Sequence, residues 1–169
     1  MYVRVSFDGC LRVAEQVFSC VLGKNGVIDA TQKREGDGRT PIGIWPMRQV
    51  FYRPDRIAAP QTQLPVIALK PDDGWCDAPN DPSYNQLVKL PYKASAEALW
   101  REDHVYDILV VLGHNDRPVV PFFGSAIFMH LTRPDRRGTE GCVALDLLDL
   151  LSILREASER SLVHVEAAA

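Results

Sequence analysis

The sequence predicts a single α+β domain that is mostly β, arranged as a β-sandwich or mixed sheet with one or two helices and a long proline-rich loop. Three observations lead to this prediction. The first half of the chain alternates short apolar runs with turn residues. Seven of the twelve prolines fall between positions 54 and 91. Near the end, apolar residues recur at helical spacing over one segment.

Length and composition agree with one folded domain that spans residues 1–169. The chain is 46% hydrophobic and 24% charged, as is typical of a globular protein, and its formal net charge is only −3. This charge excludes the strong positive field of a nucleic-acid or anionic-membrane binder. No apolar stretch approaches the roughly 18 residues that span a bilayer, and the first residues do not have the pattern of a signal peptide. We therefore expect no nucleic-acid partner, no transmembrane segment and a monomer.

Apolar runs between turns predict the strands of the first half. The predicted strands are residues 3–7, 11–13, 17–22 and 42–50. A hairpin that turns near Asp8-Gly9 would let Cys10 and Cys20 face each other and form a disulfide in an oxidising compartment, with two buried free thiols as the alternative.

The middle of the chain predicts a long ordered loop over a site. Residues 54–91 combine many prolines with Asp and Asn turn residues, a composition that is poor for long regular elements. Ser95 then caps a predicted helix of about two turns that runs to Arg101.

The last third predicts buried strands and one helix. Residues 107–113 and 125–131 are apolar runs, and His114 and His130 stand at or beside their ends. From position 143 the spacing predicts an amphipathic helix, and residues 161–166 predict a final strand. The apolar face of the helix would consist of Leu147, Leu150, Leu151 and Leu154.

Cys142 and His130 are the candidates for chemistry. A catalytic cysteine needs a base or a helix N-terminus to lower its ordinary pKa of about 8.5. Cys142 follows the flexible Gly141 and precedes the predicted helix, and the turn-rich loop 132–138 could bring His130 back to it. Taken singly, each residue also fits a structural role. No spacing among the four cysteines suits a metal, so we expect no metal site and no cofactor.

These residues resemble the active-site signature of the L,D-transpeptidase catalytic (YkuD-like) family. In that family a strand-end histidine is followed, after a loop, by a Ser/Thr-x-Gly-Cys motif that carries the nucleophile. Here His130 and Thr139-Glu-Gly-Cys142 stand in those places. The earlier Glu35-Gly-Asp-Gly-Arg-Thr-Pro-Ile-Gly43 is similar to the family's D-G-x-T-P-x-G turn. The matches cover most of the chain in the family's order.

The chain also departs from the commoner family pattern. Glu140 stands where a second histidine is usual, Leu131-Thr132 where a glycine and a hydroxyl residue are usual, and Ala144 where an arginine is usual. The interval from His130 to Cys142 is also shorter. These changes keep nucleophile and base but alter the walls of the site, so the resemblance implies a divergent branch.

The resemblance implies an L,D-transpeptidase-like fold and a peptidoglycan L,D-transpeptidase activity. The Cys142 thiolate would attack a diamino-acid residue of a stem peptide, His130 would carry the proton, and a second amine would resolve the thioester by forming a crosslink or exchanging a D-amino acid. Backbone N–H groups of Gly141, Cys142 and Glu140 would hold the oxyanion. The resemblance also implies a periplasmic or cell-envelope location and inhibition by carbapenem-type compounds.

Two other functions stay open at this point. One is a cysteine peptidoglycan hydrolase, an L,D-carboxypeptidase or amidase, which passes the acyl group to water. The other is a catalytically inert wall-binding module, because the second histidine and the arginine of the family are missing.

Further polar residues are candidates for contacts with the stem peptide. An arginine between His130 and Cys142 could pair with a carboxylate of the peptide. Residues of the proline-rich loop could act as a lid, and His114 is a competing base. The binding candidates are Trp75, Tyr84, Ser125, Arg136, Arg137, Thr139 and Glu140, followed by Asp77, Asn85, Asn115 and Arg133.

Overall fold

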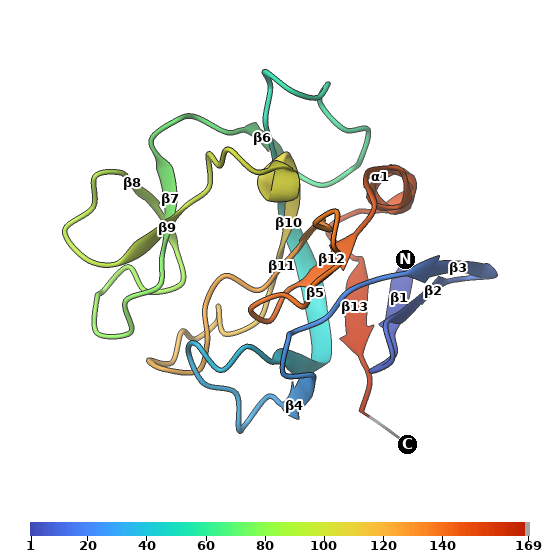
Figure 1. Ribbon diagram of the computed structural model, residues 1–169, viewed down its shortest axis with the longest axis horizontal. Helices are drawn as coiled ribbons and strands as arrows, with labels where there is room; N and C mark the ends of the chain where they lie inside the picture. Colours follow the sequence, from blue (N-terminus) through green and yellow to red (C-terminus); the bar gives the residue numbers. More distant parts are fainter. Residues whose placement is uncertain (168–169) are drawn as a thin grey trace.

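The apolar runs of the sequence form mostly strands. The structure is a computed structural model that describes residues 1–167, and within them the chain forms thirteen strands, one α-helix and one 3₁₀-helix (Figure 1). The elements are β1 (Tyr2–Val5), β2 (Cys10–Val13), β3 (Gln16–Ser19), β4 (Val27–Asp29), β5 (Thr40–Tyr52), β6 (Val66–Ala68), β7 (Asp73–Cys76), β8 (Leu87–Lys89), β9 (Ala96–Ala98), η1 (His104–Tyr106), β10 (Ile108–Leu112), β11 (Phe128–Leu131), β12 (Val143–Leu145), α1 (Leu147–Glu156) and β13 (Leu162–Val165).

Ten of these strands form one mixed sheet. Its order is β12-β11-β10-β5-β13-β1-β2-β3, and β4 and β6 pair with β5 off this path. The long strand β5 pairs with β13 through residues 43–46 and with β10 through residues 47–52. Two pairs on the main path, β11 with β12 and β1 with β13, are parallel, whereas its other pairs are antiparallel. The predicted mostly-β, α+β fold is confirmed.

The central strands are covered on both faces. On β10, Ile108, Val110 and Leu112 belong to the larger apolar core, whereas Leu109 and Val111 belong to a second core on the other side. Burying one such side chain fully stabilises the fold by about 1.5–3 kcal/mol. The continuous apolar run in the sequence is therefore explained by a strand buried on two faces.

The sequence predicted one long loop in the proline-rich segment, and this prediction is wrong. It contains β6, β7 and β8, and β7 and β8 join β9 in a separate three-stranded sheet of order β8-β7-β9. This small sheet lies apart from the large one, at the left of Figure 1. The predicted helix from Ser95 is also wrong, because residues 96–98 pair with β7 instead. Pairing with a neighbouring strand overrides the helix propensity of the alanines and the glutamate.

The predicted amphipathic helix exists but begins four residues late. Residues 143–145 form β12, and α1 starts at Leu147. Leu150 and Leu154 are fully buried, and Leu147 and Leu151 pack against the same core. The apolar stripe is thus confirmed, while the helix N-terminus that was expected next to the cysteine lies further along the chain.

Cys10 and Cys20 lie close together but are free thiols. They stand at the open end of the β2–β3 hairpin, where Cys10 pairs with Ser19, and this hairpin turns at residues 14–15. The Asp8-Gly9 turn joins β1 to β2 instead, so the predicted turn was the wrong one. Of the two alternatives left open for these cysteines, the structure has the free thiols.

None of the helices in residues 1–167 combines the length and the apolar character that crossing a membrane requires.

Candidate active site

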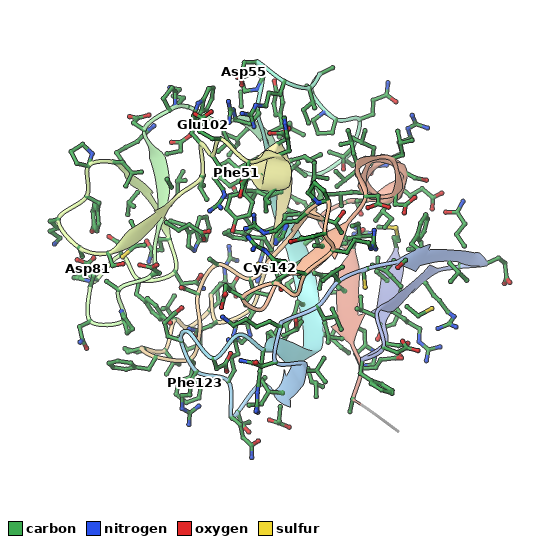
Figure 2. All side chains as sticks on the ribbon, in the orientation of Figure 1. Phe51, Asp55, Asp81, Glu102, Phe123 and Cys142 are labelled. Atoms are coloured by element: carbon green, nitrogen blue, oxygen red, sulfur yellow. The ribbon has the colours of Figure 1, made fainter. Side chains whose placement is uncertain are left out.

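Cys142, which immediately precedes β12, lies on the same face of the sheet as His130 of β11. β11 and β12 are parallel, with Met129 opposite Val143 and His130 opposite Ala144. Side chains alternate along a strand, so Cys142, two residues before Ala144, shares the face of His130. The usual strand spacing and rise put the two Cα atoms about 8 Å apart. Figure 2 shows Cys142 near the middle of the molecule, between the small sheet and the large one.

The Cys142 thiol is buried and hydrogen-bonded. Its residue is 6% exposed, and Sγ donates to the Ala126 carbonyl oxygen at 3.1 Å and accepts the Phe128 N–H at 3.4 Å. Burial raises the pKa of the thiol to about 12, although the Phe128 N–H opposes this shift. The predicted thiolate is therefore not the resting form. Cys142 is a neutral thiol that needs a base to take its proton.

The His130 side chain is arranged to act as such a base. Its Nδ1 lies 2.9 Å from the Leu131 carbonyl oxygen, which can only accept, so Nδ1 carries the proton and Nε2 has a free lone pair. Burial lowers the pKa of His130 to about 4, which keeps the ring neutral. The edge of the ring packs on Tyr106, with ring centroids 5.3 Å apart. Within residues 1–167 Nε2 makes no hydrogen bond, and the Cys142 thiol points to Ala126.

A turn closed by Thr139 presents Cys142. Thr139 Oγ1 donates to the Cys142 carbonyl oxygen at 2.7 Å and accepts the Gly141 N–H at 3.1 Å. Gly141 has a φ of +133°, and a Cβ there would meet the Arg39 carbonyl oxygen at 2.8 Å, so only glycine fits. The Gly141 N–H, an expected oxyanion donor, is thus engaged. The N–H groups of Glu140 and Cys142 have no partner within residues 1–167 and are free for that role.

The glycine-rich turn at residues 35–43 supports this loop directly. Thr40 Oγ1 donates to the Cys142 carbonyl oxygen at 3.5 Å, across 102 residues of sequence. The Asp37 carboxylate holds the turn together by pairing with the buried Lys33. The two motifs singled out in the sequence are therefore in contact.

A cavity of about 980 Å³ opens beside Cys142 and His130, and both residues line it. Side chains of both charges complete its walls. The cations are Lys24, Arg101, Arg133 and Arg137, and the carboxylates are Glu35, Asp77, Glu97 and Glu140. Volumes up to about 1,000 Å³ are typical of sites for small ligands.

The comparison with known families agrees with these features. The family described as L,D-transpeptidase catalytic domain (YkuD) matches residues 7–165, nearly the whole chain. The chain belongs to the L,D-transpeptidase catalytic domain family. Comparisons with curated proteins and with solved structures find no match. The resemblance read from the sequence is confirmed at the level of family and fold.

In this transpeptidase-family domain, loop 132–138 sends its arginines in different directions. Arg137 lines the cavity, its side chain is 64% exposed, and within residues 1–167 its one ion pair is with Asp135 at 3.8 Å. Arg136 donates to Asp146 at 2.8 Å and lines a second hollow of about 660 Å³. Of the three arginines that were candidates for binding a carboxylate, Arg133 and Arg137 line the cavity and Arg136 does not.

Trp75 and Tyr84 are buried and do not line the cavity. Trp75 Nε1 donates to Asn85 Oδ1 at 2.9 Å, and its ring packs edge-on against Phe128 at 5.1 Å. The Tyr84 hydroxyl donates to Glu35, which does line the cavity. The two aromatic residues expected to touch substrate thus support the wall from behind.

Four other predicted residues lie on the cavity wall. Glu140 pairs with Lys24 at 2.7 Å, and Thr139 uses its hydroxyl within the turn. Asp77 Oδ1 and Ser125 Oγ are buried and have no hydrogen-bond partner within residues 1–167.

His114 lies away from the cavity and serves the neighbouring loop. Its Nε2 is 2.9 Å from the Phe123 carbonyl oxygen, and burial lowers its pKa. Asn115 donates to the Val120 carbonyl oxygen at 2.9 Å. Of the two candidate bases, the structure places only His130 in the cavity.

Glu97, Arg101 and Tyr106 line the cavity and were not predicted from the sequence. The Tyr106 hydroxyl donates to Glu97 Oε1 at 2.8 Å, and burial raises the pKa of both groups. Arg101 and Arg133 both donate to Asp103, at 2.7 and 2.8 Å. These contacts fix the cationic wall and leave one Glu97 oxygen without a contact of this kind.

Proposed function

We propose that this chain is a peptidoglycan L,D-transpeptidase in which Cys142 is the nucleophile and His130 the base. The observation that carries the proposal is that both side chains project from one face of adjacent strands into the same cavity. The family match over residues 7–165 supports the type of reaction.

The neutral resting groups favour proton transfer during the attack. A stem peptide that enters the cavity brings the carbonyl of its diamino-acid residue to Sγ. As the S–C bond forms, His130 Nε2 takes the thiol proton and then gives it to the leaving amine when the C–N bond breaks. The unpartnered N–H groups of Cys142 and Glu140 stabilise the oxyanion.

A second amine completes the reaction. It attacks the thioester carbonyl and loses a proton to His130, and the thiol of Cys142 is restored when the C–S bond breaks. The product is a crosslink, or an exchanged D-amino acid when the acceptor is a free amino acid. Such a reaction places the protein in the periplasm or cell envelope, where peptidoglycan lies.

Product analysis of purified muropeptides tests this function. We expect incubation with the protein to give a crosslinked dimer, or an exchanged stem when a D-amino acid is added, detected by liquid chromatography and mass spectrometry. Trimmed stems alone would identify a hydrolase. No product, together with a Cys142 that does not react with electrophiles, would identify an inert wall-binding module.

Carbapenems should acylate Cys142. The strained β-lactam carbonyl is attacked by the same thiol–imidazole pair, so intact-mass analysis should show one adduct and peptide mapping should place it on Cys142. Cys10, which is more exposed than the other three cysteines, should stay unmodified. A protein that transfers peptides but forms no adduct would contradict an open site of this kind.

A further inference from the structure

We infer that Asp77, Glu97 and Ser125 form a subsite of the cavity that binds a primary ammonium group on the donor peptide. The inference rests on the proposed function and deepens it, because it names the groups that would recognise the donor.

Asp77 and Glu97 come from the small sheet and face the cavity together. On this sheet Glu97 of β9 pairs with Trp75 of β7, and Asp77 lies two residues further along the β7 chain. Alternation therefore puts Asp77 and Glu97 on one face, and both line the cavity. Burial raises the pKa of Glu97, and the charge of Asp77 adds to this shift.

Unpartnered buried atoms mark the same wall. Within residues 1–167 three buried side-chain polar atoms have no hydrogen-bond partner: Asp77 Oδ1, Ser125 Oγ and His114 Nδ1. Two of the three atoms belong to residues that line this cavity, and Ser125 is only 8% exposed. Buried polar atoms in folded proteins are nearly always paired, so orphans that line a cavity point to a missing ligand.

The missing ligand carries a positive charge. Asp77 forms no ion pair within residues 1–167, and the Arg101 guanidinium beside Glu97 is shared with Asp103. A primary ammonium has three N–H donors and no acceptor, which matches in number Asp77 Oδ1, the second Glu97 oxygen and Ser125 Oγ. A metal ion is a poorer match, because residues 1–167 contain no group of three or more His, Cys, Asp or Glu side chains that could hold one.

The bound amine belongs to the donor rather than to the acceptor. The acceptor amine must lose its proton in order to attack the thioester, and two carboxylates would stabilise the protonated form instead. An amine that stays charged throughout the reaction suits this wall. The donor diamino acid carries such an amine on its side chain.

The test compares two donor peptides with the full-length protein. One is a stem tetrapeptide with the diamino-acid side-chain amine, and the other is the same peptide with that amine replaced by hydrogen. The same free D-amino acid serves as acceptor in both reactions. For the wild-type protein we expect kcat/KM to fall about 10- to 100-fold when the amine is removed, the range for a hydrogen-bonded charged group. Equal kcat/KM for the two donors would overturn the subsite.

Variants assign the effect to its residues. Asp77→Asn and Glu97→Gln should lower kcat/KM for the donor with the amine and leave the other donor nearly unchanged. Asp72→Asn is the matched control, since Asp72 immediately precedes β7 of the small sheet, is exposed, and pairs with Lys89 outside the cavity. If Asp77→Asn lowered kcat/KM equally for both donors, the Asp77 carboxylate would not recognise the amine. If the wild-type protein transferred neither donor, the proposed function itself would fail.

Discussion

Replacing Cys142 with alanine is expected to reduce transpeptidation to the uncatalysed level. Without the sulfur no thioester forms, and loss of a nucleophile in comparable acyl-transfer enzymes costs on the order of 10⁶-fold in kcat. The exchange of a D-amino acid into a stem peptide is the measurement. The variant should still fold, because alanine removes one buried atom from a site that the surrounding strands define.

The other cysteines provide the controls for this variant. Cys10, Cys20 and Cys76 do not line the cavity, so alanine at each position should leave turnover intact. Thermal unfolding should confirm that all four variants remain folded. Crosslinking or trimming of muropeptides by the Cys142→Ala protein would show that the nucleophile lies elsewhere.

Replacing His130 with alanine is expected to slow acylation by about 10²–10⁴-fold, the usual contribution of a general base. The effect should be large because burial raises the pKa of Cys142 to about 12 and leaves almost no thiolate to react without a base. Acyl-enzyme formation, followed by intact mass, measures this step. His104→Ala and His164→Ala change histidines outside the cavity, so these variants should keep nearly the wild-type acylation rate.

The pH profile of the wild-type protein tests the same assignment. Burial lowers the pKa of His130 to about 4, so its neutral form persists to lower pH than in a free imidazole. We expect kcat/KM to fall only as the pH drops through about 4, where the ring becomes protonated. A fall centred near the ordinary value of about 6.5 would mean that the base is a more exposed group.

The sequence was informative where one pattern had one structural solution. The apolar run 125–131 predicted a buried strand, which the structure has over residues 128–131, and the leucine stripe from Leu147 predicted a helix face. Residues 95–101 had two solutions, because Ala and Glu favour a helix while their alternation also fits a strand. In the structure residues 96–98 form a strand because they pair with the free edge of β7. A local sequence pattern does not reveal which strand edge is available for pairing.

The two reactive residues of the site could be predicted from the sequence, whereas several residues that line the cavity could not. Cys142 and His130 stood out because their chemistry and their motif coincide. Glu97 was hidden in the segment read as a helix, although a carboxylate between Ala96 and Ala98 in an alternating stretch was a usable signal. Cys142 and His130 share one face because β11 and β12 pair in parallel. The sequence does not show the relative direction of these two strands.

The position of β13 has a consequence for how the chain acquires this structure. In the strand order, β13 lies between β5 and β1, so it alone connects β1, β2 and β3 to the remainder of that path. During synthesis, residues 1–19 have no place in the sheet until residues 162–165 have left the ribosome. Until then β5 and β1 each expose an unpaired edge, the kind of surface on which chains aggregate. Pairings between such distant segments also form slowly. A nascent chain of this protein is therefore expected to expose both edges until residues 162–165 pair with β1 and β5.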